Sequence, residues 1–271
     1  MGGRGGPGGG PLLGHVTELR VTRDGGVARL TLDRPPLNVL TPALIEAIGA
    51  AFRELSADPA LRVVVLAGSG QAFSAGVDVA AMRDLDVVGA RALIERLRTT
   101  IRALEDVPVP TIARLHGHVL GGALELVLAC DLRIAAASCR LGMPEITVGI
   151  PSVIQAALLP GLIGWGRTSE LLLGGRPVDA PEAERWGLVS RAVEEAALDQ
   201  AVEDWVGRLL ALPPDALRLQ KALLTRWRRV DLDTAVALST DVFARAYSTG
   251  EPRRAMQAFF DRRVDARRPE A

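Results

Sequence analysis

The sequence predicts an α/β fold in which strands alternate with helices, followed by a mostly helical C-terminal region. Short apolar runs such as "LRVVVLAG" are typical of buried strands, and segments with apolar residues at helical spacing separate them. From about residue 160 onward helical patterns dominate. Hydrophobic residues make up 48% and charged residues 24% of the 271 positions, which indicates a globular protein with a sizeable core.

The first half of the chain carries the alternation. Two strands flank a turn at residues 24–26. A helix is expected from a start signal at residues 41–42 to the stop at Pro59, and a longer one over residues 87–105. The segment "TIARLHGHVLGGALELVL" is expected to begin as one strand, to turn at residues 121–122 and to continue as an apolar helix. The strand "DLRIAAA" follows.

The second half carries helical stripes in "LPGLIGWGRTSELLLGG", "DQAVEDWVGRLLALP", "PDALRLQKALLTRW" and "LDTAVALSTDVFARAYS". We therefore divide the chain into a disordered glycine-rich tail (1–14), an α/β core (15–200) and a helical region (201–271).

Composition bounds the function classes. The net charge is +0, with 32 basic and 32 acidic residues, so no nucleic-acid partner is expected. The two cysteines do not make a disulfide framework, which favours a reducing cytoplasm. No apolar run is long enough to cross a bilayer, and the start lacks the apolar block of a signal peptide, so no membrane partner is expected. His116 and His118 could form a metal pair, but no further ligand set is evident, and we expect no metal.

Two turns place small residues where a strand ends and a helix begins: "AFSAGVD" (72–78) and "GHVLGGALEL" (117–126). A helix start has unpaired backbone N–H groups and a partial positive charge, and glycine lets another group approach them. Two such N–H groups converging on one point would form an oxyanion hole. Taken singly, a glycine turn is usually only a turn.

Two carboxylates follow in apolar surroundings. Glu125 falls in the first turn of a helix that starts near Gly122, and Glu145 stands twenty residues later, after a proline. Such a pair near an apolar pocket could hold a water and exchange protons. A favourable contact with the helix dipole is the alternative explanation for Glu125.

The ordered pattern resembles the enoyl-CoA hydratase/isomerase (crotonase) family. The matching segments run from about residue 16 to 265 and include "LTLDRPPLNVLTPAL", "DPALRVVVLAGSGQAFSAGVDVAAM", "HGHVLGGALELVLACDLRIAAASCRLGMPE", "DAPEAERWGLVSRAV" and "EPRRAMQAFFDRR". The resemblance implies a spiral of ββα units with a helical C-terminal region, and assembly as a homotrimer or homohexamer through residues 201–271.

The resemblance also implies hydration of a trans-2-enoyl-CoA to a 3-hydroxyacyl-CoA. By position, the N–H groups of Val77 and Gly122 would bind the thioester oxygen, Glu145 would mainly give a proton to C2, and Glu125 would mainly activate water. No prosthetic group is implied, and coenzyme A (CoA) enters as part of the substrate. Enoyl-CoA isomerase, acyl-CoA hydrolase or decarboxylase chemistry, or CoA binding without catalysis, are the alternatives.

Further residues are implied in CoA binding. The backbone around Pro36 and Leu37 would line the CoA path, and the carbonyl of Ala75, with its neighbours Gly76 and Asp78, would meet the adenine. Residues of the C-terminal helix can reach such a site, often across a subunit interface. They are Phe259 and Arg262, for which core packing and surface charge are equally good explanations.

One segment departs from the family pattern. "VGIPSVIQAALLP" is one residue shorter than in typical hydratases, and Ser152, Val153 and Ile154 (within Ile150-Pro151-Ser152-Val153-Ile154) replace small residues. Their bulk near the acyl pocket would restrict the chain length or favour an unusual acyl group. Ser152 is expected to be a helix N-cap, with a hydrogen bond to substrate or water as the alternative.

Overall fold

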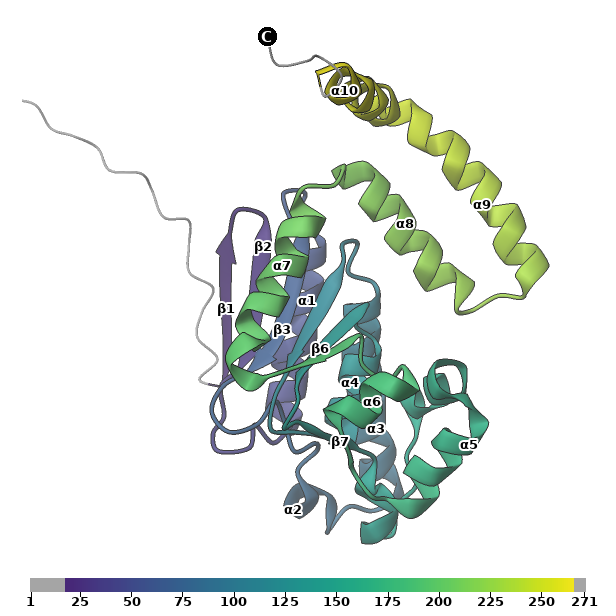
Figure 1. Ribbon diagram of the computed structural model, residues 1–271. Helices are drawn as coiled ribbons and strands as arrows, with labels where there is room; N and C mark the ends of the chain where they lie inside the picture. Colours follow the sequence, from purple (N-terminus) through teal and green to yellow (C-terminus); the bar gives the residue numbers. More distant parts are fainter. Residues whose placement is uncertain (1–17, 266–271) are drawn as a thin grey trace, which may run out of the picture.

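The computed structural model describes residues 18–265, with side chains to residue 261, so the predicted tail (1–14) lies outside the described residues. Two sheets organise the chain (Figure 1). The larger sheet has the strand order β1-β2-β3-β4-β6-β9 and the smaller one β5-β7-β8. The strands are β1 (Leu19–Asp24), β2 (Val27–Leu32), β3 (Val63–Gly68), β4 (Thr111–Leu115), β5 (His118–Leu120), β6 (Leu132–Ala136), β7 (Arg140–Gly142), β8 (Val178–Asp179) and β9 (Arg191–Val193).

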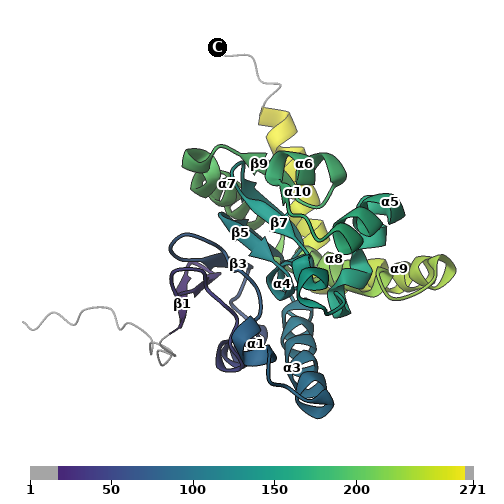
Figure 2. The same ribbon diagram turned by 90° about the horizontal axis from the view of Figure 1, so that it is seen from below.

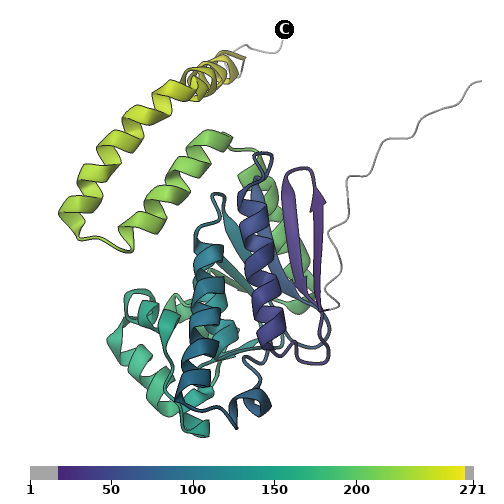
Figure 3. The same ribbon diagram turned by 180° about the vertical axis from the view of Figure 1, so that it is seen from behind.

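The larger sheet is covered on both faces. Helices α1 (Pro42–Ser56) and α3 (Val87–Glu105) lie side by side on one face (Figure 3), and α7 (Leu198–Leu210) lies on the other. Successive residues of β3 point to opposite faces of the sheet. Val64 and Leu66 pack with α1 and α3, and Val63 and Val65 pack with α7. Because both faces are buried, the strand reads as a continuous apolar run. The expected helix over residues 87–105 is confirmed.

The chain changes sheets at His116–Gly117. The single strand expected before residues 121–122 is wrong, because β4 pairs in the larger sheet and β5 pairs with β7 in the smaller one. Gly117 has a φ of +59°, and a Cβ there would lie 2.0 Å from the Gln71 carbonyl oxygen, so only glycine fits the bend. Here β4 enters the larger sheet, β5 enters the smaller one, and the helix α4 (Gly122–Leu128) follows.

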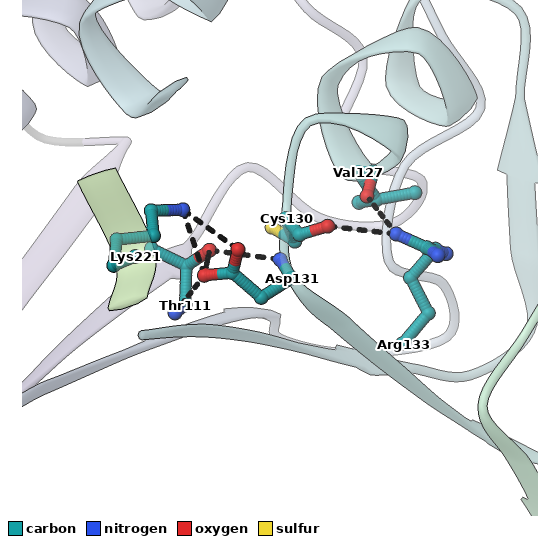
Figure 4. Close-up of polar contacts among 6 residues, drawn as sticks. All are labelled: Thr111, Val127, Cys130, Asp131, Arg133 and Lys221. Carbon is teal, nitrogen blue, oxygen red and sulfur yellow. Dashed lines mark hydrogen bonds and ion pairs between the residues drawn. The ribbon is translucent and has the colours of Figure 1, made fainter. Parts of the chain in front are cut away.

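Helix α4 lies near the middle of the molecule, between α3 and the β5–β7 strands (Figure 2). All seven of its residues are buried. Its C-terminal end is held by Arg133, which donates to the carbonyl oxygens of Cys130 at 2.8 Å and Val127 at 3.4 Å (Figure 4). These bonds satisfy carbonyls that a helix end leaves unpaired, and they hold α4 at its C-terminal end.

The remaining helices begin with α2, which lies between β3 and α3 in the chain, and continue to the C-terminal region. They are α2 (Val79–Met82), η1 (Pro144–Val148), η2 (Ile154–Leu158), α5 (Leu159–Gly174), α6 (Ala180–Trp186), η3 (Glu195–Ala197), α8 (Pro214–Trp227), α9 (Leu232–Ala246), η4 (Tyr247–Thr249) and α10 (Glu251–Asp265). Helices α8 to α10 extend away from the sheets (Figure 1). Among residues 18–265, no helix is long and apolar enough to cross a membrane. The division at residue 200 stays a prediction.

A buried ion pair ties α8 to the core. Lys221, the only lysine of the sequence, donates to both carboxylate oxygens of Asp131 at 2.8 and 2.7 Å (Figure 4). The backbone N–H and the hydroxyl of Thr111 donate to Asp131 Oδ2 as well. Because a buried charge without a partner is strongly destabilising, this contact fixes where α8 leaves the core.

Candidate active site

A pocket opens between α2, α3, the start of α4 and η1. It encloses about 650 Å³, part of it open to solvent. Apolar side chains make up most of the wall, and the two glutamates singled out from the sequence are the titratable groups among its lining residues. The lining residues are Ala75, Gly76, Val77, Val79, Met82, Ile94, Leu97, Gly121, Gly122, Glu125, Pro144, Glu145, Thr147, Val148, Ile150, Pro151 and Val153.

The N–H of Val77 is left available by the way its segment pairs. Leu40 donates its N–H to the Gly76 carbonyl at 2.8 Å and accepts from the Asp78 N–H at 3.3 Å. In this parallel bridge Leu40 hydrogen-bonds to the residues before and after Val77, so the backbone N–H of Val77 takes no part in the bridge. Within the described residues, nothing accepts a hydrogen bond from its N–H.

The N–H of Gly122 lies close by, at the first residue of α4. Such an N–H has no partner inside its own helix, and no described residue accepts from it. A Cβ on Gly76 would lie 2.6 Å from the Leu120 carbonyl oxygen, and one on Gly122 would lie 2.8 Å from Val77 Cγ2. The two turns singled out from the sequence therefore touch, and glycine makes that approach possible.

Glu125 lies in the first turn of α4 and is 3% exposed. Burial raises its pKa to about 8, and the negative charge of Glu145 adds to the rise. Backbone hydrogen bonds from Ala156 and Val153 act in the opposite direction; the Ala156 N–H lies 3.4 Å from Glu125 Oε1. Burial therefore favours the protonated form of Glu125 at neutral pH.

Glu145 is half-buried at the start of η1 and faces the same pocket. Its Oε1 packs so tightly against Gly121 that a Cβ there would lie 2.6 Å away. Its Oε2 accepts a hydrogen bond from the Ser152 hydroxyl at 2.8 Å. The N-cap role predicted for Ser152 is wrong: Val153 is the N-cap residue of η2, and no side chain caps that helix.

The residues expected along the CoA path are only partly brought together. Ala75 and Gly76 line the pocket, and the Ala75 N–H donates to the Leu37 carbonyl at 2.9 Å, which places the loop containing Pro36 beside them. The carboxylate of Asp78 instead caps α2, accepting from the Ala80 N–H at 2.9 Å.

The other expected residues lie elsewhere. Helix α10, which carries Phe259, lies at the opposite end of the molecule from α2 (Figure 1). The Phe259 ring contacts the Phe260 ring edge-on. The side chain of Arg262 lies outside the described part. His116 is buried between Arg114 and the Gly70 carbonyl, and the described residues contain no cluster of three or more metal-ligating side chains.

Two residues that hold the site were not singled out from the sequence. Asn38 is fully buried with a φ of +49°, and its amide donates to the carbonyls of Ser69 and Ala72, at 2.8 Å each. The Ser74 hydroxyl accepts from the Gly76 N–H at 3.1 Å. An asparagine in a proline-rich loop is a turn signal, but its long-range partners have no local signature.

A pocket with two available N–H groups and two carboxyls, one of them buried, has groups that can polarise a carbonyl. The sequence model of the Enoyl-CoA hydratase/isomerase family matches residues 22–266. The chain therefore belongs to the enoyl-CoA hydratase/isomerase (crotonase) family, as the sequence motifs indicated.

Relatives cover nearly the whole chain. The short-chain-enoyl-CoA hydratase of Clostridium acetobutylicum is 32% identical over 252 residues, covering 92% of this chain and 97% of the relative. The crotonyl-CoA hydratase of Syntrophomonas wolfei is 34% identical over 240 residues, covering 88% and 92%.

Solved structures agree with the fold. The Mycobacterium smegmatis enoyl-CoA hydratase has a TM-score of 0.87 at 34% identity, with 93% and 98% of the two chains covered. Pseudomonas aeruginosa DspI has a TM-score of 0.88 at 28% identity, with 92% and 96% covered. The predicted α/β crotonase fold is confirmed.

The raised pKa of Glu125 predicts a pH-dependent stability. The unfolded chain ionises this group near its ordinary value of 4.5, whereas the folded chain keeps it neutral up to about pH 8. The free energy of unfolding should therefore fall as the pH rises between these values, by up to about 1.4 kcal/mol per pH unit from this group. Glu125→Gln should remove that contribution. Urea unfolding of both proteins from about pH 5 to pH 8 measures the difference.

The control is Glu46→Gln, on the exposed face of α1. Parallel pH curves for the wild type and Glu125→Gln would contradict the prediction.

Proposed function

We propose that this protein hydrates a trans-2-enoyl-CoA to the 3-hydroxyacyl-CoA. The observation that carries the proposal is that both glutamates line one apolar pocket beside the two available N–H groups. The relatives named as hydratases support the same reaction. The apolar wall suits a hydrocarbon chain rather than a polar acyl group.

The N–H groups of Val77 and Gly122 would bind the thioester oxygen. As water adds to C3, electron density moves from the C2–C3 double bond onto that oxygen, and two donors aimed at it stabilise the enolate-like transition state. The start of α4 adds its partial positive charge on the same side. The substrate is thereby polarised without a metal-dependent step.

The carboxyl pair would hold the water and the protons. In the proposed resting site Glu125 would be the acid, and Glu145 would be the carboxylate that accepts its proton. We propose that, with the thioester bound, the proton passes from Glu125 through the water to Glu145. Glu125 then takes a proton from the water as its oxygen bonds to C3, and Glu145 gives its proton to C2. Both carboxyls return to their resting state, and one water has been added.

Loss of the conjugated enoyl absorbance of crotonyl-CoA tests this function. The wild type should consume the absorbance with formation of 3-hydroxybutyryl-CoA. Glu125→Gln and Glu145→Gln should each lower kcat by about 10²–10⁴-fold, since each removes a proton-transfer group. Glu46→Gln, on an exposed surface, should retain full activity.

The alternative chemistries give different products in the same assay. Double-bond migration, thioester cleavage to free CoA, or release of carbon dioxide from a malonyl-type thioester would each replace hydration as the function. Binding of crotonyl-CoA without turnover would contradict an enzymatic role toward this substrate.

We also propose that the chain assembles as a homotrimer or homohexamer through its C-terminal helices. Leu232, Val236 and Phe243 are 77%, 61% and 69% exposed, and their spacing places them on one face of α9. Tyr247, the C-cap residue of α9, is 56% exposed and its ring contacts Phe243. An apolar stripe of this kind is typical of a surface that packs against a partner. Phe259 and Arg262 would reach a CoA site only across such an interface.

Light scattering after size-exclusion chromatography should give three or six times the chain mass of 28.7 kDa. Phe243→Glu should lower that mass by placing a charge in the stripe. Arg245→Glu, which changes an exposed residue on the other side of α9, should leave the mass unchanged. A wild-type mass of one chain would contradict the assembly.

A further inference from the structure

Ser152 lies between η1 and η2 and contacts the site directly. Its half-buried hydroxyl donates to Glu145 Oε2 at 2.8 Å. This is the one side-chain hydrogen bond to the Glu145 carboxylate within the described residues. The hydroxyl is therefore not occupied in building a helix end.

The segment that follows Ser152 reaches the other carboxyl. The Ala156 N–H lies 3.4 Å from Glu125 Oε1, and the Val153 backbone also stabilises the ionised form of Glu125. Between them, Ile154 has a φ of +36°, an uncommon conformation for a β-branched residue. One short and conformationally restricted segment thus holds both members of the pair at fixed positions.

Other charges do not replace this contact. Glu125, on α4, is the titratable group that faces Glu145 across the pocket. On α3, Glu95 pairs with Arg98, and Glu105 pairs with Arg102 and Arg229. On α5, the Arg167 guanidinium lies over the Trp186 ring, and Glu170 is exposed. None of these side chains lines the pocket.

We propose that Ser152 is a positioning residue that orients the Glu145 carboxylate and keeps the negative charge of the pair on it. A donated hydrogen bond stabilises a carboxylate over the corresponding acid. The contact thereby leaves the single proton of the pair on Glu125 and directs Glu145 Oε1 toward Gly121 and the pocket. This role rests on the proposed hydration reaction. Residues 150–154, where the sequence departs from the family pattern, would then affect proton transfer rather than only the size of the acyl pocket.

The pH profile of kcat with crotonyl-CoA tests the proposal. In Ser152→Ala, the acidic limb should move to higher pH by about one unit, because a hydrogen bond to a charged group is lost. At pH values below this acidic limb, the kcat of Ser152→Ala should be about tenfold lower than that of the wild type, with KM changed less than about twofold. Ser152→Thr, which keeps the hydroxyl, should restore the wild-type profile.

Ser138→Ala is the matched control, because it removes a hydroxyl that donates to the carboxylate of Glu195 at 3.0 Å outside the pocket. It should leave the profile unchanged. If Ser152→Ala does not fold by circular dichroism, Ser152→Gly removes the same hydroxyl with less steric demand. An acidic limb at the same pH in the folded variant and the wild type would overturn the proposal, whatever the change in rate.

A second readout does not need turnover. The carbon-13 carboxyl signal of Glu145, identified by its absence in Glu145→Gln, should titrate at higher pH in Ser152→Ala than in the wild type. Identical titrations would overturn the role of Ser152. If the wild type does not hydrate crotonyl-CoA, the proposed function fails, while this comparison still decides whether the hydroxyl controls the charge of Glu145.

Discussion

The site depends on a backbone contact that leaves no room for a side chain. The segment before α2 meets the turn before α4 at Gly76, where a Cβ would lie 2.6 Å from the Leu120 carbonyl oxygen. This approach sets the N–H of Val77 beside the N-terminus of α4. The Leu40 N–H donates to the Gly76 carbonyl, the Asn38 amide donates to the Ala72 carbonyl, and the Ser74 hydroxyl accepts from the Gly76 N–H. These hydrogen bonds fix the segment. Both backbone donors are left without an acceptor among the described residues, Val77 beside an isolated bridge and Gly122 at a helix start.

A second constraint is electrostatic. Glu125 is almost fully buried, so α4 brings a carboxyl group into apolar surroundings where its ionised form is disfavoured. Glu145 is less buried, and its carboxylate accepts a hydrogen bond from Ser152. The two carboxyls of one pocket therefore lie in different surroundings, and such differences are typical of carboxyl pairs that exchange protons. Arg133 at the far end of α4 supports the helix that carries the buried member.

The order of strands and helices could be predicted because the buried strands are apolar on both faces and the helices carry clear start signals. The two glycine turns and the glutamates were likewise visible in the sequence. The change of sheet at Gly117 was not, since the apolar pattern runs through it without a break. The sequence predicts a helix cap at Ser152, because no local pattern shows that the Glu145 carboxylate lies 2.8 Å from its hydroxyl. Asn38 bonds across 34 positions of the chain, a separation that leaves no local pattern.

The central claim is that the N–H groups of Val77 and Gly122 act together on a thioester carbonyl. The infrared stretch of carbon-13-labelled crotonyl-CoA, bound to a Glu125→Gln/Glu145→Gln double variant that cannot turn it over, tests this directly. Two converging donors lengthen the C=O bond, so the band of the bound thioester should lie at lower frequency than in water. A bound thioester whose band stays at its aqueous frequency would contradict the account.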